Sequence, residues 1–170
     1  MELMKVIEKR RSVREYQSRE VSDEILNRIL EAARLAPSAR NRQPWKFIVV
    51  RDPKRRRELA EAARNQSFIG KAPVVIVGVA LDPNHIMSSG VPAYAVNMGI
   101  AMEHIALAAQ NEGLGTCWIG GFSQEEVKKI LGVPDAYKVA CLMPMGYPAD
   151  SQGTRIRKPL EEIICQEQYS

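Results

Sequence analysis

The stretch PAYAVNMGIAMEHIALAAQN, residues 92–111, is apolar on nearly every side. Pro92 at its start suits the first helical position, and Gly113 just beyond its end suits the residue that follows a helix. The stretch therefore predicts one long helix. A helix without a polar face is buried, either inside the domain or against a partner chain.

Strands and shorter helices are predicted on both sides of the long helix. Residues 74–80 are apolar at every position and predict a strand in the middle of a sheet. Further strands are predicted over residues 45–50 and 138–145, and residues 114–121 predict a strand or loop broken by glycines. Helices are predicted over residues 2–10, 23–36, 53–65 and 124–131, with a short one from Pro159. This order favours a layered α+β fold, and 170 residues predict a single domain over residues 1–170.

Composition excludes several classes of protein. Hydrophobic residues make up 45% and charged residues 26%, as in a globular chain, and the net charge of +4 permits anionic partners without identifying one. No apolar run can cross a bilayer, and the charged N-terminus contains no signal peptide, so a cytoplasmic protein without membrane contact is expected. Three widely spaced cysteines argue against a disulfide framework and against a metal site.

Familiar catalytic signatures are absent from the sequence. It has no phosphate-binding loop of a nucleoside triphosphatase and no nucleophile elbow of a hydrolase. Gly113-Leu114-Gly115 begins like a dinucleotide fingerprint but follows a helix instead of a strand. His104, in the middle of the long helix, is interpreted as a hydrogen-bonded interior or interface residue.

Two cationic clusters lie near opposite ends of the chain. Arg10-Arg11-Ser12-Val13-Arg14 places three guanidinium groups and a hydroxyl at a helix end, a set that suits a phosphate dianion. In the second cluster, Arg155-Ile156-Arg157-Lys158, an extended backbone would point Arg155 and Arg157 the same way. One shared phosphate site and a solvated basic turn remain the two interpretations.

A third basic run, Lys54-Arg55-Arg56-Arg57, predicts a different role. It lies in an amphipathic helix together with Glu58 and Glu61, which is typical of a solvated face. It lacks the interleaved aromatic residues of a site for single-stranded nucleic acid, so no nucleic-acid partner is expected.

The segment GLGTCWIGG, residues 113–121, combines small residues with one flat aromatic side chain. Glycines allow a backbone to approach a planar ligand closely, and a bulge or turn is the alternative interpretation. Cys117 has no basic neighbour in the sequence and is interpreted as a packing residue.

Taken in order, these segments resemble the nitroreductase family of flavin mononucleotide (FMN) enzymes in its short form. The resemblance is carried by RRSVR at residues 10–14, PSARNRQPW at 37–45, the long helix with GLGTCWIGG at 113–121, GYP at 146–148 and RIRKPL at 155–160. It implies an α+β fold with a mixed central sheet flanked by helices. It also implies a homodimer with the long helix at the interface and two shared FMN sites.

The resemblance implies a role for each of these groups. It assigns the phosphate and ribityl chain of FMN to Arg10, Ser12, Arg14, Arg155 and Arg157, with Arg11 nearer the flavin ring. It assigns Pro37, Ser38, Ala39 and Asn41 to the site of the other subunit, with Gln43 beside them. Trp118, Ile119, Gly120 and Gly121 are expected along the isoalloxazine, and Asn65 or Gln66 near its pyrimidine edge.

The implied activity is the reduction of nitroaromatics, quinones or similar conjugated acceptors by NADH or NADPH, in two half-reactions at one flavin face. The flavin, not a dedicated side chain, carries this chemistry. Two alternatives stay open: a specialised flavin reductase or dehalogenase-type enzyme of the same fold, and a flavin-binding regulatory module without turnover. Many longer members carry Glu at the position of Gly120 and an additional helical excursion, for which only residues 82–92 are available here.

Overall fold

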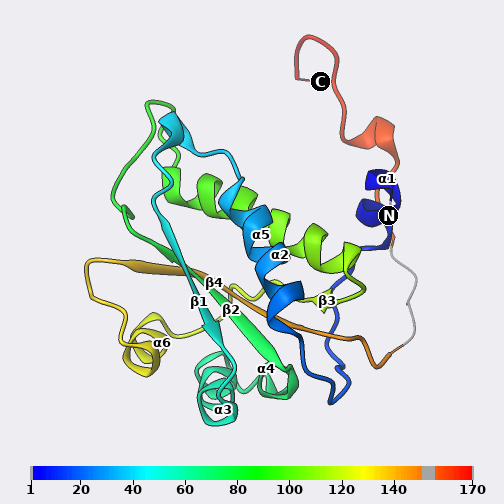
Figure 1. Ribbon diagram of the computed structural model, residues 1–170. Coiled ribbons are helices and arrows are strands. Elements are labelled where there is room, and N and C mark those ends of the chain that lie inside the picture. The colour runs from blue at the N-terminus through cyan, green and yellow to red at the C-terminus, as the bar shows by residue number, and fades with distance from the viewer. Residues whose placement is uncertain (1, 151–155, 170) are drawn as a thin grey trace.

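A four-stranded antiparallel sheet lies between two layers of helices in the computed structural model, which describes residues 2–150 and 156–169 (Figure 1). The strand order is β1-β2-β4-β3. The strands are β1 Trp45–Val50, β2 Val74–Ala80, β3 Gly115–Thr116 and β4 Lys138–Gly146. The helices are α1 Leu3–Lys9, α2 Asp23–Arg34, α3 Pro53–Ala62, α4 Ser67–Lys71, α5 Ala93–Asn111 and α6 Gln124–Leu131, with 3-10 turns η1 Ala39–Asn41 and η2 Leu160–Glu162.

β2 is the centre of the sheet, as its continuous apolar sequence predicts. All seven of its residues are buried, and it pairs with β1 on one side and β4 on the other. Val74 and Ile76 face the layer of α2 and α5, while Val75 and Val77 face the layer of α3 and α6. A strand with a core on both faces needs apolar side chains at every position.

α5 is the long helix that residues 92–111 predict, although Pro92 occupies the N-cap and not the first helical position. Met98, Met102 and Ile105 are fully buried against the sheet and α2. Gly78 of β2 allows this close packing, because a Cβ there would lie 2.7 Å from the sulfur of Met98. The prediction of a buried helix is confirmed.

The α+β class is confirmed, and the structure shows which strand pairs in the predicted mixed sheet are antiparallel and which are parallel. All pairs of named strands are antiparallel. Among the described residues, the parallel component is one isolated bridge between Ser12 and Thr116. That bridge joins the first basic cluster to β3.

The helix predicted over residues 53–65 ends early, at Ala62, and the separate helix α4 was not predicted. Arg64 and Asn65 separate the two helices, because their left-handed φ angles of 60° and 58° interrupt the helical backbone. Non-glycine residues adopt this conformation at a cost, so no pattern of glycine or proline marked the break. The next predicted start, at Ser123, is confirmed: its Oγ accepts a bond from Glu126 N at 3.3 Å.

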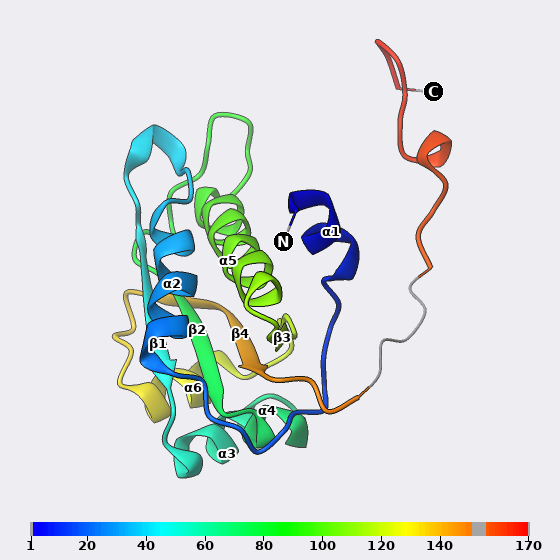
Figure 2. The ribbon, with the colours of Figure 1, turned by 45° about the vertical axis from the view of Figure 1, so that its right-hand side comes forward.

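The C-terminal arm, residues 156–169, projects away from the sheet and its helices (Figure 2). The short helix predicted from Pro159 is a single 3-10 turn. The arm exposes several large apolar side chains, namely Ile156, Leu160, Ile163, Ile164 and Tyr169.

Candidate functional site

The first basic cluster lies directly against the glycine-rich segment that follows α5. Val13 N donates to Thr116 O at 2.9 Å, and Ser12 bridges Thr116 in parallel. A Cβ at Gly115 would lie 2.3 Å from Cγ2 of Val13, so only glycine allows this approach. Two segments a hundred residues apart in sequence therefore form one surface.

Arg10, Ser12 and Arg14 act on the pKa of the same buried thiol, Cys117. Burial raises the pKa of Cys117, while Arg14, a hydrogen bond with Ser12, and Arg10 oppose that rise. Arg10 Nε is 3.5 Å from Glu103 Oε1 of α5, and the guanidinium carbon of Arg14 is 5.9 Å from the ring centroid of Phe68 in α4. Cys117 is 2% exposed, which confirms that it packs in the core.

Arg11 has a partner that the sequence did not indicate. Its Nη1 and Nη2 donate to Oδ2 and Oδ1 of Asp150 at 2.7 and 2.6 Å. This bidentate contact lowers the pKa of Asp150, so the carboxylate is charged at neutral pH. The pair connects the end of α1 to the segment after β4. Its contacts are shorter than the 3.5 Å between Arg10 and Glu103.

The segment from Trp118 to Gly121 forms an open face beside these cations. Trp118 is 43% exposed, and a Cβ at Gly120 would meet no atom within 4 Å. Ile119 pairs with Leu142 of β4, which fixes the backbone. A planar ligand can approach the backbone there without displacing a side chain.

Arg64 and Gln66 lie next to Gly121, at the end of this segment. A Cβ on Gly121 would lie 3.7 Å from the guanidinium of Arg64, and Gln66 Nε2 is 3.5 Å from Gly121 O. Arg64 was missed by sequence reasoning, because only its left-handed backbone turns it toward Gly121. Gln66 was one of the two residues expected near a pyrimidine edge.

The loop at residues 37–43 is a strained turn held on α5. Ala39 N donates to the buried Asn97 Oδ1 at 3.1 Å, and Gln43 N donates to Ser38 Oγ at 2.9 Å. Arg40, Asn41 and Gln43 have φ angles of 54°, 54° and 50°. Such conformations persist where surrounding structure imposes them, and they concentrate at functional sites.

One protomer does not bring every predicted residue together. The turn η1 lies near the N-terminal end of α5, and α1, which leads into the first basic cluster, lies beside the C-terminal half (Figures 1 and 2). Arg157 is exposed on the arm and donates to the carbonyl of Ile156 at 3.1 Å. Arg155 lies outside the described residues. Within one protomer the predicted flavin residues thus form two separate sets. The first set comprises Arg10, Ser12, Arg14 and residues 118–121, and the second comprises Pro37, Ser38, Ala39, Asn41, Gln43 and Arg157.

The gathered residues fit FMN in their chemistry. Two guanidinium groups and a hydroxyl suit a phosphate dianion, and the exposed indole beside the open backbone of Gly120 suits a flat ring. Over residues 2–150 and 156–169, no cluster of His, Cys, Asp or Glu could hold a metal ion. Within the same ranges, every helix is too short or too polar to traverse a bilayer.

Comparison with known proteins defines the class. The model of the nitroreductase family matches residues 7–73 and 63–147. The chain is 31% identical to an FMN reductase [NAD(P)H] of Bacillus subtilis, covering 99% of this chain and 74% of the relative. It is 34% identical to an NADH dehydrogenase of Thermus thermophilus, covering 92% and 91%.

Solved structures agree with these matches. A nitroreductase family protein from Clostridium novyi NT superposes with a TM-score of 0.85 at 38% identity, covering 88% of this chain and 87% of that one. The NADPH:FMN oxidoreductase of Vibrio harveyi, complexed with NAD+, superposes with a TM-score of 0.90 at 27% identity, covering 99% and 78%. The protein belongs to the nitroreductase family, and its class is that of NAD(P)H-dependent oxidoreductases.

Proposed function

We propose that the protein is an FMN-dependent oxidoreductase that uses NADH or NADPH to reduce nitroaromatics, quinones or similar conjugated acceptors. The observation that carries this proposal is that the segment containing Arg10, Ser12 and Arg14 is bridged and packed directly against the glycine-rich segment 115–121. The names of the relatives support it, since the Bacillus subtilis protein is an FMN reductase and the Vibrio harveyi structure contains NAD+.

Each part of the gathered surface has a proposed task. Arg10 and Arg14 hold the phosphate by charge-assisted hydrogen bonds, and Ser12 adds a hydroxyl donor. Arg155 and Arg157 are proposed to add further cations to the phosphate. Residues 118–121 lie along the flavin ring, where the lack of a side chain at Gly120 leaves room and where backbone N–H groups can donate.

FMN, when bound, supplies the redox chemistry by accepting a hydride at N5 and passing electrons to an acceptor. The residues around it orient the nicotinamide and the acceptor, which use the same open face in turn, so a two-step exchange mechanism is proposed. Neither step needs a histidine at this face. His104 Nδ1 lies 3.0 Å from Ala32 O between α5 and α2, which fits the interior role expected for it.

We also propose a homodimer in which the partner completes each site. The arm exposes 65% of Ile163 and 50% of Ile164, and α1 exposes 66% of Leu3 and 58% of Met4. Apolar side chains at these levels on neighbouring elements mark a protein interface. A second copy that covers them would also supply the loop at residues 37–43.

The proposal is tested with the purified protein. Its visible spectrum and its binding of added FMN are recorded first; a colourless protein that does not bind FMN contradicts the proposal. Stopped-flow mixing of the yellow protein with NADH and with NADPH is the second step. Bleaching by either donor, followed by recovery on addition of a quinone, is expected. A flavin that neither donor bleaches would favour the regulatory module.

A further inference from the structure

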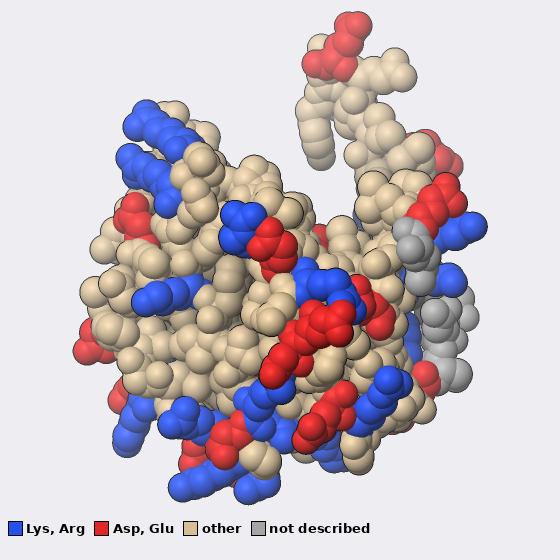
Figure 3. Space-filling model, in the orientation of Figure 1, with Lys and Arg blue, Asp and Glu red and all other residues tan. Residues whose placement is uncertain are grey.

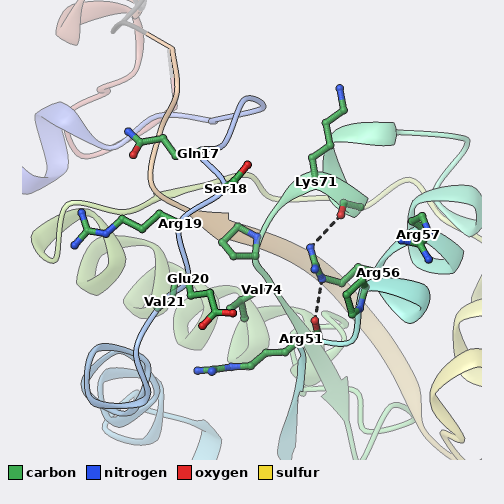
Figure 4. A pocket seen from close by; sticks show the side chains of 13 residues that line it. Gln17, Ser18, Arg19, Glu20, Val21, Arg51, Arg56, Arg57, Lys71 and Val74 are labelled. Carbon is green, nitrogen blue, oxygen red and sulfur yellow. Dashed lines mark hydrogen bonds between the residues drawn. The ribbon is translucent and has the colours of Figure 1, made fainter.

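A hollow lined by residues 17–21 lies against α3, α4 and the start of β2 (Figure 4). Its volume is 560 Å³, within the range of about 300–1,000 Å³ usual for small-molecule sites. None of the proposed flavin ligands lines it. Its lining residues are Gln17, Ser18, Arg19, Glu20, Val21, Arg51, Pro53, Arg56, Arg57, Gly70, Lys71, Pro73 and Val74.

The lining of this hollow is cationic, and Figure 3 shows Lys and Arg, interspersed with Asp and Glu, over the lower end of the molecule where Figure 1 places α3 and α4. Five of its side chains are Arg or Lys, and Glu20 is the single acid. Arg51 is paired with Asp23 at 2.8 Å, and Arg19 stacks 3.8 Å from the ring centroid of Tyr147. Within the described ranges, Arg57 and Lys71 at the rim have no ion pair. Two cations are therefore available to a ligand.

Arg56 lies at the centre of the hollow and is fixed there by backbone carbonyls (Figure 4). Its Nε donates to Arg51 O at 3.1 Å, and its Nη1 donates to Gly70 O at 3.0 Å and to Ala72 O. Its Nη2 has no acceptor among the described residues. The guanidinium is thus positioned by three carbonyls and still has donors to offer.

The protein compensates the charge of Arg56 only in part. Burial lowers the pKa of Arg56 and the neighbouring Arg57 lowers it further, while the carboxylate of Asp52 opposes this shift. A partly buried cation next to a second cation is unfavourable unless an anion accompanies it. The expectation of a solvated face over Lys54–Arg57 is correct for the exposed Lys54, Arg55 and Arg57, and wrong for the partly buried Arg56, which backbone carbonyls hold.

We propose that this hollow binds a phosphate-bearing anion, with Arg56 Nη2 as the central donor and with Arg57 and Lys71 closing from the rim. A phosphate group suits this lining better than a carboxylate, because it accepts several charge-assisted bonds at once and carries up to two charges. The site is distinct from the flavin site and does not depend on the proposed redox activity.

The first test is equilibrium dialysis of the FMN-saturated protein against radiolabelled pyrophosphate, with ionic strength held constant by KCl. FMN blocks the flavin phosphate site, so saturable binding of one pyrophosphate per chain is expected at the hollow. ADP is measured in parallel. Tighter binding of ADP identifies a nucleotide as the ligand class, and equal binding identifies the phosphate groups alone. The absence of saturable binding of both overturns the proposal.

Matched variants locate the binding. Arg57→Gln and Lys71→Gln are each expected to weaken pyrophosphate binding about tenfold, while the visible flavin spectrum stays unchanged. Lys54→Gln is the control, because it removes the same charge from α3 outside the hollow, where Lys54 lies 3.9 Å from Glu58. An equal loss in Lys54→Gln would mean non-specific attraction and would overturn the proposal. If the protein did not bind FMN, the proposed flavin-dependent function would be contradicted. The pyrophosphate affinities of wild type, Arg57→Gln, Lys71→Gln and Lys54→Gln could still be compared to test the hollow.

Discussion

The two groups of predicted flavin residues, the first basic cluster and the loop at residues 37–43, are held by different parts of the same protomer. Arg10, Ser12 and Arg14 are held against β3 and the segment after it by hydrogen bonds within the protomer. The loop at residues 37–43 is held by a hydrogen bond from Ala39 N to Asn97, but near the other end of α5. Each group is held locally, and in the proposed homodimer a second copy of the chain would bring complementary groups together.

The difference shows where the stability of each group originates. The first group depends on close backbone approach, since Gly115 and Val13 allow no larger residue between them. The second depends on one buried amide and three left-handed residues. The arm contributes to neither within one protomer. We therefore expect the largest effects on flavin binding from changes that prevent two chains from associating.

Replacing Ile163 and Ile164 together by Ser is expected to have the largest effect. Burial of each side chain contributes about 1.5 kcal/mol or more, so the dimer should weaken by roughly 3 kcal/mol, or about 150-fold. Sedimentation velocity and FMN titration measure the two consequences. Gln166→Ser with Gln168→Ser is the control on the same arm. A double variant that stays dimeric and yellow would show that the arm does not join the protomers.

Arg10→Ala and Arg157→Ala test whether both clusters hold one phosphate. Loss of one charge-assisted contact costs about 1.5–3 kcal/mol, so FMN affinity should fall roughly 10- to 150-fold in each variant. Lys54→Ala should change it less than about twofold, because its exposed pair with Glu58 is weak. Fluorescence titration of FMN measures all three. Three equal effects would separate the clusters from the phosphate.

Asn97→Ala tests the anchoring of the loop. The variant leaves Ala39 N without its acceptor, which should lower the free energy of unfolding by about 1–3 kcal/mol in urea titration. FMN affinity should fall by several-fold as the loop loses its geometry. Asn84→Ala, at an exposed position, is the control. Unchanged flavin binding in a destabilised Asn97 variant would remove the loop from the site.

The sequence predicted the elements whose side chains face the core. β2 is apolar throughout because both of its faces are buried, and α5 is apolar on most sides because it packs on the sheet and α2. These patterns follow from burial alone, so the sequence is sufficient to predict them. The order of motifs along the chain then identified the family.

Details that arise from tertiary contacts were not predictable. The left-handed turn at Arg64 and Asn65 has no glycine to mark it, and it creates both α4 and the position of Arg64 beside Gly121. The partner of Arg11 lies 139 residues away, beyond any local pattern. Arg56 sits in a run that reads as solvated, and only packing against α4 shows that one member is fixed by carbonyls.

Asp150→Asn is expected to have the smallest effect, because Asp150 stabilises the fold through its pair with Arg11 and is not itself among the proposed FMN ligands. The Arg11 hydrogen bond lowers the pKa of Asp150 in the folded state, so its stabilisation is present above the ordinary pKa of about 3.9 and is lost as the pH falls through the lowered value. At neutral pH the variant should lose about 1 kcal/mol or less, since 31% of the Asp150 side chain is exposed. Urea titrations from neutral to acidic pH should show the gap from wild type closing below about pH 3.9. Asp135→Asn, on an exposed turn, is the control. A gap for Asp150→Asn that persists in acid would mean that the ion pair is not its cause.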